Sequence, residues 1–326
     1  MPKVSVVIPN YNHARFLRQR IDSVLKQTFQ DFEVILLDDS STDDSRSILS
    51  SCAGDPRVRI EFNDANSGST FKQWNKGVRL ARGEYVWIAE SDDFADPRFL
   101  ERLVAVLDAK PQVVFVSCRS WRISDDGQLE GFADAHLNEL DPSRWTADFC
   151  ADGREECKKY LLLLNTVINA SAVVFRRAIY DHVGGADESL RLCGDWKLWV
   201  SMALLGEVAY IAEALSYFRS HESTVRIQST KQGLTAVECM EMAHWMLHQV
   251  RPSSATEQTL RQRLSYIWIP AMTSGHVPFK RRWEILRHAM AIDPQAARRL
   301  LRPMLAALRI KFLQLIRLQR QRSEQA

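Results

Sequence analysis

The chain has 326 residues, carries a formal net charge of +3 and is 46% hydrophobic. This composition indicates a globular protein of roughly one to three domains with enough apolar material for a large core. It excludes a disordered chain, a small disulfide scaffold, a fibrous protein and a nucleic-acid binder that depends on bulk positive charge. The six cysteines form no CxxC pair and no metal-ligand spacing, so we expect mostly buried thiols and a reducing compartment.

Positive charge is concentrated near the C-terminus. From residue 276 onward, twelve Lys and Arg stand against three Asp and Glu, a net charge of +9.

The apolar run at residues 4–8 is too short for the core of a signal peptide. The longest uncharged stretch, residues 160–175, contains Asn165, Thr166, Asn169 and Ser171, which argues against a transmembrane helix. We therefore expect a cytoplasmic protein.

The first half of the chain alternates short β-rich runs with amphipathic helical patterns. This alternation predicts an α/β fold with a doubly wound, mostly parallel sheet flanked by helices. The predicted strands are residues 4–8, 32–37, 58–62, 85–89 and 113–116, and the predicted helices are 15–27, 44–52, 70–81 and 98–109.

Beyond residue 117 the pattern is less regular, and beyond residue 228 it is helical with prolines as breaks, among them Pro270. We predict a domain boundary there, with an α/β domain at 1–228 and a helical C-terminal extension at 229–326. Between residues 117 and 228 we predict a loop at 124–142, helices at 155–164, 177–183 and 197–205, a strand at 170–175, and a strand pair at 208–211 and 215–219.

Polar and acidic clusters follow three of the predicted strands, at residues 10–13, 38–44 and 90–93. Ligands of doubly wound sheets bind beyond the carboxyl ends of the strands, so these clusters should converge on one edge. The adjacent carboxylates of Asp92 and Asp93 repel each other, and a divalent cation that binds both would relieve that repulsion. The alternative is that these aspartates only cap the helix that follows.

Eight short motifs follow one another along the chain, at residues 4–12, 37–43, 66–68, 81–85, 90–93, 184–190, 194–196 and 217–221. Together they resemble the family 2 glycosyltransferases, which have the GT-A type fold. The resemblance covers about residues 3–225. It therefore implies that the α/β domain is a nucleotide-sugar-dependent catalytic domain.

The resemblance implies a nucleotide-sugar site in the first half of the chain. Pro9, Tyr11 and Asn12 belong to the motif that surrounds the nucleotide base and ribose. Asp39 matches the acid that hydrogen-bonds a pyrimidine, although an aspartate in such a polar loop also suits a turn. Lys72 stands where a basic contact to the nucleotide is expected.

The resemblance also implies a metal site and a catalytic base. Asp92 and Asp93 match the DxD-type element, whose acids contact the ribose and an Mn²⁺ or Mg²⁺ ion that bridges the donor's diphosphate. His221 matches a position that meets the metal or diphosphate in some members, and its alternative role is structural. Asp195 matches the acid usually assigned as the base, and its alternative role is the N-cap of the helix predicted from Lys197.

Two residues depart from the family pattern. Glu90 stands where the first Asp of the DxD-type element is frequent, and Gly194 stands where many members have Glu beside the base. The Gln-x-x-Arg-Trp element of processive polysaccharide synthases does not occur in the sequence, which favours transfer of a single sugar.

We therefore expect an inverting, non-processive glycosyltransferase that moves one sugar from a UDP- or dTDP-sugar to a hydroxyl of a glycan or lipid-linked acceptor, in polysaccharide or lipid-linked glycan assembly. A sugar hydroxyl is a poor nucleophile and a diphosphate is a charged leaving group, so the site needs a base and a cation. One alternative, motivated by Glu90 and Gly194, is a catalytically degenerate protein that binds a nucleotide sugar or a partner. The other alternative is a sugar-phosphate nucleotidyltransferase, in which a Gly-rich basic loop would be expected after the first strand.

The C-terminal tail at residues 298–326 has apolar residues at helical spacing among basic ones. A helix of this kind suits peripheral contact with the anionic inner face of a membrane. The alternative is a helix packed on its own domain or on a second subunit. The apolar residues are Leu301, Met304, Leu305, Leu308, Phe312 and Leu315.

Overall fold

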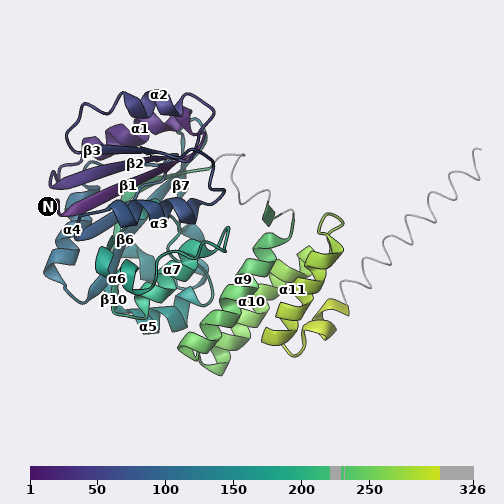
Figure 1. Cartoon of the computed structure of the whole chain (residues 1–326). Coiled ribbons are helices and arrows are strands. Elements are labelled where there is room, and N and C mark those ends of the chain that lie inside the picture. Colours follow the sequence, from purple (N-terminus) through teal and green to yellow (C-terminus); the bar gives the residue numbers. More distant parts are fainter. Residues whose placement is uncertain (221–228, 231, 302–326) are drawn as a thin grey trace, which may run out of the picture. The chain divides into compact units, whose positions relative to one another are not determined.

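The computed structural model describes residues 1–220, 229–230 and 232–301, and it divides the chain into two units, Met1–Glu222 and Ser223–Ala326 (Figure 1). The predicted boundary at residue 228, the predicted metal ligand His221 and the tail from residue 302 lie outside the described residues. The domain ranges 1–228 and 229–326 and the amphipathic tail therefore stay predictions.

The first unit is built on one ten-stranded sheet with the order β3-β2-β1-β4-β9-β6-β10-β5, where β7 is added to β6 and β8 to β10. Strands β3, β2, β1 and β4 are parallel, as are β6 and β10, whereas β9 runs antiparallel between β4 and β6. The α/β prediction is confirmed, with a sheet that is mixed. The strands are β1 (Val4–Asn10), β2 (Phe32–Asp38), β3 (Val58–Phe62), β4 (Tyr85–Ile88), β5 (Phe94–Ala95), β6 (Val113–Ile123), β7 (Leu129–Phe132), β8 (Phe149–Asp152), β9 (Val173–Arg176) and β10 (Glu207–Arg219).

Helices cover both faces of this sheet (Figure 1). On one face, α1, α2 and α4 contribute Leu17, Leu49 and Leu103 to a core cluster that includes alternate side chains of β1. On the other face, α3 approaches β1 so closely that a Cβ on Gly77 would lie 2.2 Å from the Val7 side chain. The helices are α1 (Ala14–Leu25), α2 (Ser45–Ser50), α3 (Thr70–Leu80), α4 (Phe99–Ala109), α5 (Gly153–Glu156), α6 (Arg177–His182) and α7 (Gly194–Ala203), with a π-helical turn at Cys157–Leu161 and 3₁₀ turns at Ala135–Glu139, Arg144–Thr146 and Ala170–Ala172.

The elements predicted in the first half of the chain are confirmed. Each predicted strand and helix begins within one residue of its observed start, because short apolar runs indicate buried strands and amphipathic periods indicate helices packed on a sheet. Strand β6 continues beyond the predicted end, to Ile123. All six cysteines are thiols outside any disulfide, and four of them are buried as expected: Cys52, Cys118, Cys157 and Cys193.

Two predictions in the later part of this unit are wrong. The segment at 124–142, predicted to be a loop, contains β7, because Phe132 stacks on Trp121 with ring centroids 4.2 Å apart across the β6–β7 pair. The predicted strand pair at 208–211 and 215–219 is the single strand β10, whose register shifts around Ala214 keep it paired with β6 along its length.

In the described part of the second unit, helices α9 (Leu234–Val250), α10 (Ser254–Thr273) and α11 (Phe279–Ile292) contact one another. Their buried side chains include Met240, Trp268 and Ile285. Pro270 does not break α10 as predicted, because it lies in the last turn and the helix continues to Thr273. Among the described residues, no helix combines the length and apolarity needed to cross a membrane.

Candidate active site

The first half of α3 contacts all three regions in which the sequence placed functional acids. Gln73 donates a hydrogen bond to Asp39, which follows β2, and Trp74 donates one to Glu90, which follows β4. Phe71 lies against Gly194, next to Asp195 at the start of α7. The three regions therefore converge on one helix, at the carboxyl edge of the parallel strands.

Polar side chains fix the loop that follows β1. Asn12 has a left-handed backbone with φ 55°, its N–H donates to Ser41 Oγ at 2.9 Å, and its Oδ1 accepts from the Thr42 N–H at 2.7 Å. Asn12 thus fastens the loop after β1 to the loop after β2. Pro9 is buried, whereas Tyr11 is 45% exposed and leaves an aromatic ring at the surface of this edge.

Asp39 organises the loop that leads into α3. Its carboxylate is 4% exposed and accepts hydrogen bonds from the Asn63 amide at 2.6 Å, from the Ser67 N–H at 2.9 Å and hydroxyl at 2.8 Å, and from the Gln73 amide at 2.9 Å. These contacts give Asp39 a structural role in the loop, and its role in base binding stays a prediction. Lys72 is exposed on the same turn, with Nζ 3.4 Å from the Ser67 carbonyl oxygen.

Two arginines hold the acidic segment at residues 90–93. Arg219, at the end of β10, donates its backbone N–H to Asp93 Oδ1 and its Nε–H to the Asp92 carbonyl oxygen, each at 2.9 Å. Arg20 on α1 is fully buried, donates its Nε–H to the Glu90 carbonyl oxygen at 2.7 Å and places Nη2 3.9 Å from Asp93 Oδ2. Asp93 is consequently buried between the two arginines, whereas Asp92 is partly exposed.

The carboxyl groups of this segment lie close together and are largely buried. Burial raises the pKa of Glu90 to about 8, and the charge of Asp92 adds to the rise while the hydrogen bond from Trp74 opposes it. Burial and the charge of Asp92 also raise the pKa of Asp93, against the opposing charge of Arg20. A cation bound at this segment would favour the ionised forms of these carboxyl groups. Among the described residues, no group of three or more His, Cys, Asp and Glu side chains is arranged to hold a metal ion.

Asp195 lies in the first turn of α7, which begins at Gly194 rather than near Lys197 as predicted. Its Oδ2 accepts a hydrogen bond from the Asn165 amide at 3.1 Å. Asn165 opens a segment, residues 165–171, whose other end is also at the site, because the Ser171 hydroxyl accepts the Glu90 N–H at 3.0 Å. One short segment therefore supports both the predicted base and the acidic segment.

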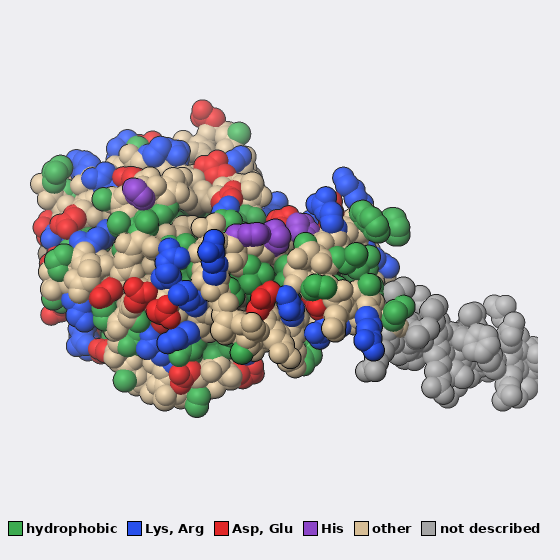
Figure 2. Space-filling view, turned by 90° about the horizontal axis from the view of Figure 1, so that it is seen from below, with side chains coloured by type: hydrophobic (Ala, Val, Ile, Leu, Met, Phe, Trp, Pro, Cys, Tyr) green, Lys and Arg blue, Asp and Glu red, His purple; other side chains and the backbone are tan. Residues whose placement is uncertain are grey.

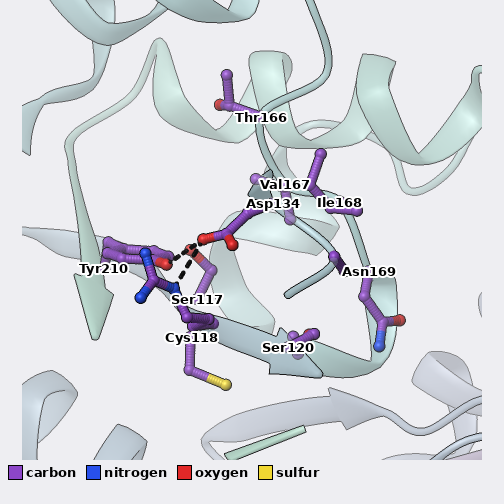
Figure 3. A pocket seen from close by; sticks show the side chains of 12 residues that line it. Ser117, Cys118, Ser120, Asp134, Thr166, Val167, Ile168, Asn169 and Tyr210 are labelled. Carbon is purple, nitrogen blue, oxygen red and sulfur yellow. Dashed lines mark hydrogen bonds and ion pairs between the residues drawn. The ribbon is translucent and has the colours of Figure 1, made fainter. Parts of the chain in front are cut away.

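A buried polar cluster lies beside the segment at residues 165–171. Figure 3 shows Asp134 directed toward Tyr210, whose hydroxyl donates to it at 2.8 Å, and Arg119 Nε donates to the same carboxylate at 3.0 Å. The adjoining cavity, lined by Asn169 among others, has a volume of about 10 Å³, the size of one water molecule. It is too small for a sugar, so we treat this cluster as structural.

The ring of Phe71 leaves no room for a side chain at Gly194. A Cβ at this position would lie 2.4 Å from Cε2 of Phe71, so the aromatic ring fills the place of a side chain beside Asp195. Phe71 therefore occupies the space that a side chain at position 194 would need. Asn165, rather than a residue at position 194, donates a side-chain hydrogen bond to Asp195.

A comparison with known families places the chain. The model for Glycosyl transferase family 2 matches residues 5–184, more than half of the sequence. The chain belongs to glycosyl transferase family 2. This confirms the family inferred from the eight motifs.

Curated relatives of this family 2 chain include two bacterial proteins. The uncharacterized glycosyltransferase alr2836 of Nostoc sp. is 30% identical over 67% of the chain and 65% of its own length. Glycosyltransferase GlyG of Streptococcus pneumoniae is 37% identical over 35% of the chain and 38% of its own length. The chain thus spans less than two thirds of these relatives.

Solved structures share the fold. TarS 1-349 of S. aureus in complex with UDP-GlcNAc has a TM-score of 0.69 at 18% identity, over 95% of this chain and 88% of that one. Mannosyltransferase PcManGT of Pyrobaculum calidifontis, in complex with GDP-Man and Mn2+, has a TM-score of 0.56 at 17% identity, over 92% and 87%. The likeness is one of fold, and it confirms the predicted GT-A type architecture of this family 2 chain.

The contact between Gly194 and Phe71 gives a stability prediction. Gly194→Ala should destabilise the protein by about 1 to 3 kcal/mol, the usual cost of overpacking a filled site. Gly54→Ala is the matched control, because no atom lies within 4 Å of the position that its Cβ would occupy, and it should change stability by less than about 0.5 kcal/mol. Urea unfolding of both variants measures the difference. Combining Gly194→Ala with Phe71→Ala should cost less than the two changes summed, and strict additivity would contradict the proposed contact.

Proposed function

We propose that this family 2 protein is an inverting, non-processive glycosyltransferase that moves one sugar from a nucleoside-diphosphate donor, a UDP- or dTDP-sugar, to a hydroxyl of a glycan or lipid-linked acceptor. The supporting observation is the convergence of Asp39, the acidic segment at 90–93 and Asp195 on the first half of α3. The setting would be polysaccharide or lipid-linked glycan assembly on the cytoplasmic side of a membrane.

The donor would lie across the carboxyl edge of β1, β2 and β4. Tyr11 offers an exposed ring for the base, and Asp39 lies at the same edge with Lys72 on the adjoining turn. Pro9 and Asn12 would shape this part of the site from the β1 loop. The complexes of TarS with UDP-GlcNAc and of PcManGT with GDP-Man support a nucleotide-sugar donor.

Asp92 is the carboxylate best suited to contact the ribose and a divalent cation. It is partly exposed, whereas Asp93 is buried and accepts the Arg219 N–H, so we assign Asp93 mainly to positioning Asp92. Mg²⁺ sites commonly use one or two carboxylates together with substrate phosphates, which fits an open site of this kind. Mn²⁺ or Mg²⁺, when bound, would offset the charge of the departing diphosphate. His221 remains a further proposed ligand.

Asp195 would accept the proton of the acceptor hydroxyl. As the acceptor oxygen bonds to the anomeric carbon, the bond from that carbon to the diphosphate oxygen breaks, and the electron pair leaves with the diphosphate. Attack from the face opposite the leaving group gives inversion. The Asn165 amide donates to Oδ2 of Asp195, and the backbone N–H of Trp196 donates to Oδ1 at 2.7 Å, so both oxygens of the proposed base are held in position.

A test of the donor site uses Asp92→Ala. UDP with Mn²⁺ should stabilise the parent by about 2.7 kcal/mol at a ligand concentration near 100 times Kd, and UDP alone should have little effect because the carboxylates repel the diphosphate. The variant should lose the response to Mn²⁺. Glu130→Ala, on the exposed strand β7, is the control. Thermal shifts in Asp92→Ala equal to those of the parent would remove Asp92 from the site.

A test of the base uses Asp195→Asn, which keeps the size of the side chain and removes the proton acceptor. Sugar transfer or donor hydrolysis should fall by about 10² to 10⁴, with UDP affinity unchanged. Asp181→Asn, exposed on α6, is the matched control and should keep parental turnover.

The same assay separates the alternatives. Parental turnover in Asp195→Asn would place the base elsewhere, with Asp187 or Glu188 next to be tested. A parent that binds UDP but never transfers or hydrolyses a donor would favour the catalytically degenerate binding protein. Formation of a nucleotide sugar from a nucleoside triphosphate and a sugar phosphate would favour a nucleotidyltransferase.

A further inference from the structure

Helix α11 has two apolar faces, and only one of them packs against the rest of its unit. Ile285, Ala289 and Ile292 are buried. On another side of the helix, Phe279 is 83% exposed, Trp283 is 65% exposed and Met290 is 55% exposed. Large apolar side chains left in water on one helix mark an interaction surface when they are contiguous.

Helical geometry makes them contiguous. At about 100° per residue, Phe279, Trp283, Leu286 and Met290 fall within a sector of about 60°, whereas the buried residues lie on a separate sector. We call these four residues the α11 strip. Its two aromatic rings lie in the N-terminal half of the helix.

Basic residues border the α11 strip. Lys280 and Arg287 lie next to it on one side at the same spacing, and neither makes an ion pair within the part of the chain that the structure describes. On the other side, Arg282 donates to the carbonyl oxygens of Val277 and Ser274. Figure 2 shows hydrophobic and basic side chains next to one another on the helical unit. The helix contains four Lys and Arg and one acidic residue, Glu284.

We propose that the α11 strip docks on an anionic membrane surface, with its aromatic and apolar side chains at the headgroup boundary and Lys280 and Arg287 against lipid phosphates. Interfacial helices combine Trp, Phe and Leu on one side with Lys and Arg beside them, which is the arrangement of α11. This inference uses described residues of the second unit only, and it does not depend on the proposed transferase activity.

Charge favours a membrane over a second copy of the chain. A two-fold contact uses the same patch on both copies, so antiparallel pairing of two α11 strips would bring their Lys280 and Arg287 borders together. Both borders are positive and would repel. An anionic lipid surface instead attracts every basic residue along the strip, and salt weakens that attraction.

The test is sedimentation of the full-length protein with vesicles of phosphatidylcholine alone or mixed with phosphatidylglycerol. The parent should bind the anionic vesicles, and added salt should weaken the binding. Phe279→Ser combined with Trp283→Ser should reduce partitioning about tenfold or more, since each removed aromatic ring loses buried apolar area. Lys280→Glu combined with Arg287→Glu should reduce binding to anionic vesicles with no loss on neutral ones.

Tyr266→Ser is the matched control, because Tyr266 is 71% exposed on α10 outside the strip. Circular dichroism and UDP binding show whether each variant is folded and keeps its donor site. The proposal is overturned if the parent does not bind anionic vesicles, or if the strip variants bind as well as Tyr266→Ser does. It is also overturned if the strip variants change the sedimentation coefficient without vesicles, which would identify self-association as the role of the strip.

Discussion

The site depends on the burial of two arginines beside a run of acids. Arg20 and Arg219 come from opposite ends of the first unit's sequence and meet the same four-residue segment after β4. A buried charge that loses its partner costs about 3 to 5 kcal/mol, so the arginines and Asp93 stabilise the folded unit only together. Their contacts fix the backbone at 90–93 and leave Asp92 at the surface of the segment.

Arg219 extends this constraint to neighbouring elements. Its guanidinium also donates to the carbonyl oxygens of Ser124 and Asp125 and to Gln19 Oε1. The end of β10, the turn after β6 and helix α1 are thereby fastened to the acidic segment. On the other face of the sheet, α3 fixes Asp39, Glu90 and the start of α7 through Gln73, Trp74 and Phe71. The geometry of the site thus comes from contacts between distant parts of the sequence.

The sequence predicted the strands, helices and acidic motifs of the first half well, because each is encoded by neighbouring residues. It did not predict the supports, since Arg20 and Asp93 are separated by more than seventy residues and Arg219 is farther still. Asn165, Asn169 and Ser171 did give a signal, as polar residues in an otherwise apolar stretch. That signal argued only against a membrane span, and the contacts of Asn165 with Asp195 and of Ser171 with Glu90 required the fold. Likewise, no local sequence pattern predicts the contact between Phe71 and Gly194.

The most direct test of this account is the affinity of UDP in the presence of Mn²⁺ for Arg219→Lys, measured by isothermal titration calorimetry. Lysine keeps the charge but loses the planar fork that contacts the Asp92 carbonyl oxygen and the turn at Ser124. The account predicts a protein that stays folded and binds UDP with Mn²⁺ at least about tenfold more weakly, a loss of about 1.4 kcal/mol. Arg102→Lys, exposed on α4, should bind as the parent does. Parental affinity in Arg219→Lys would contradict the claim that the buried arginines position the acidic segment for the donor.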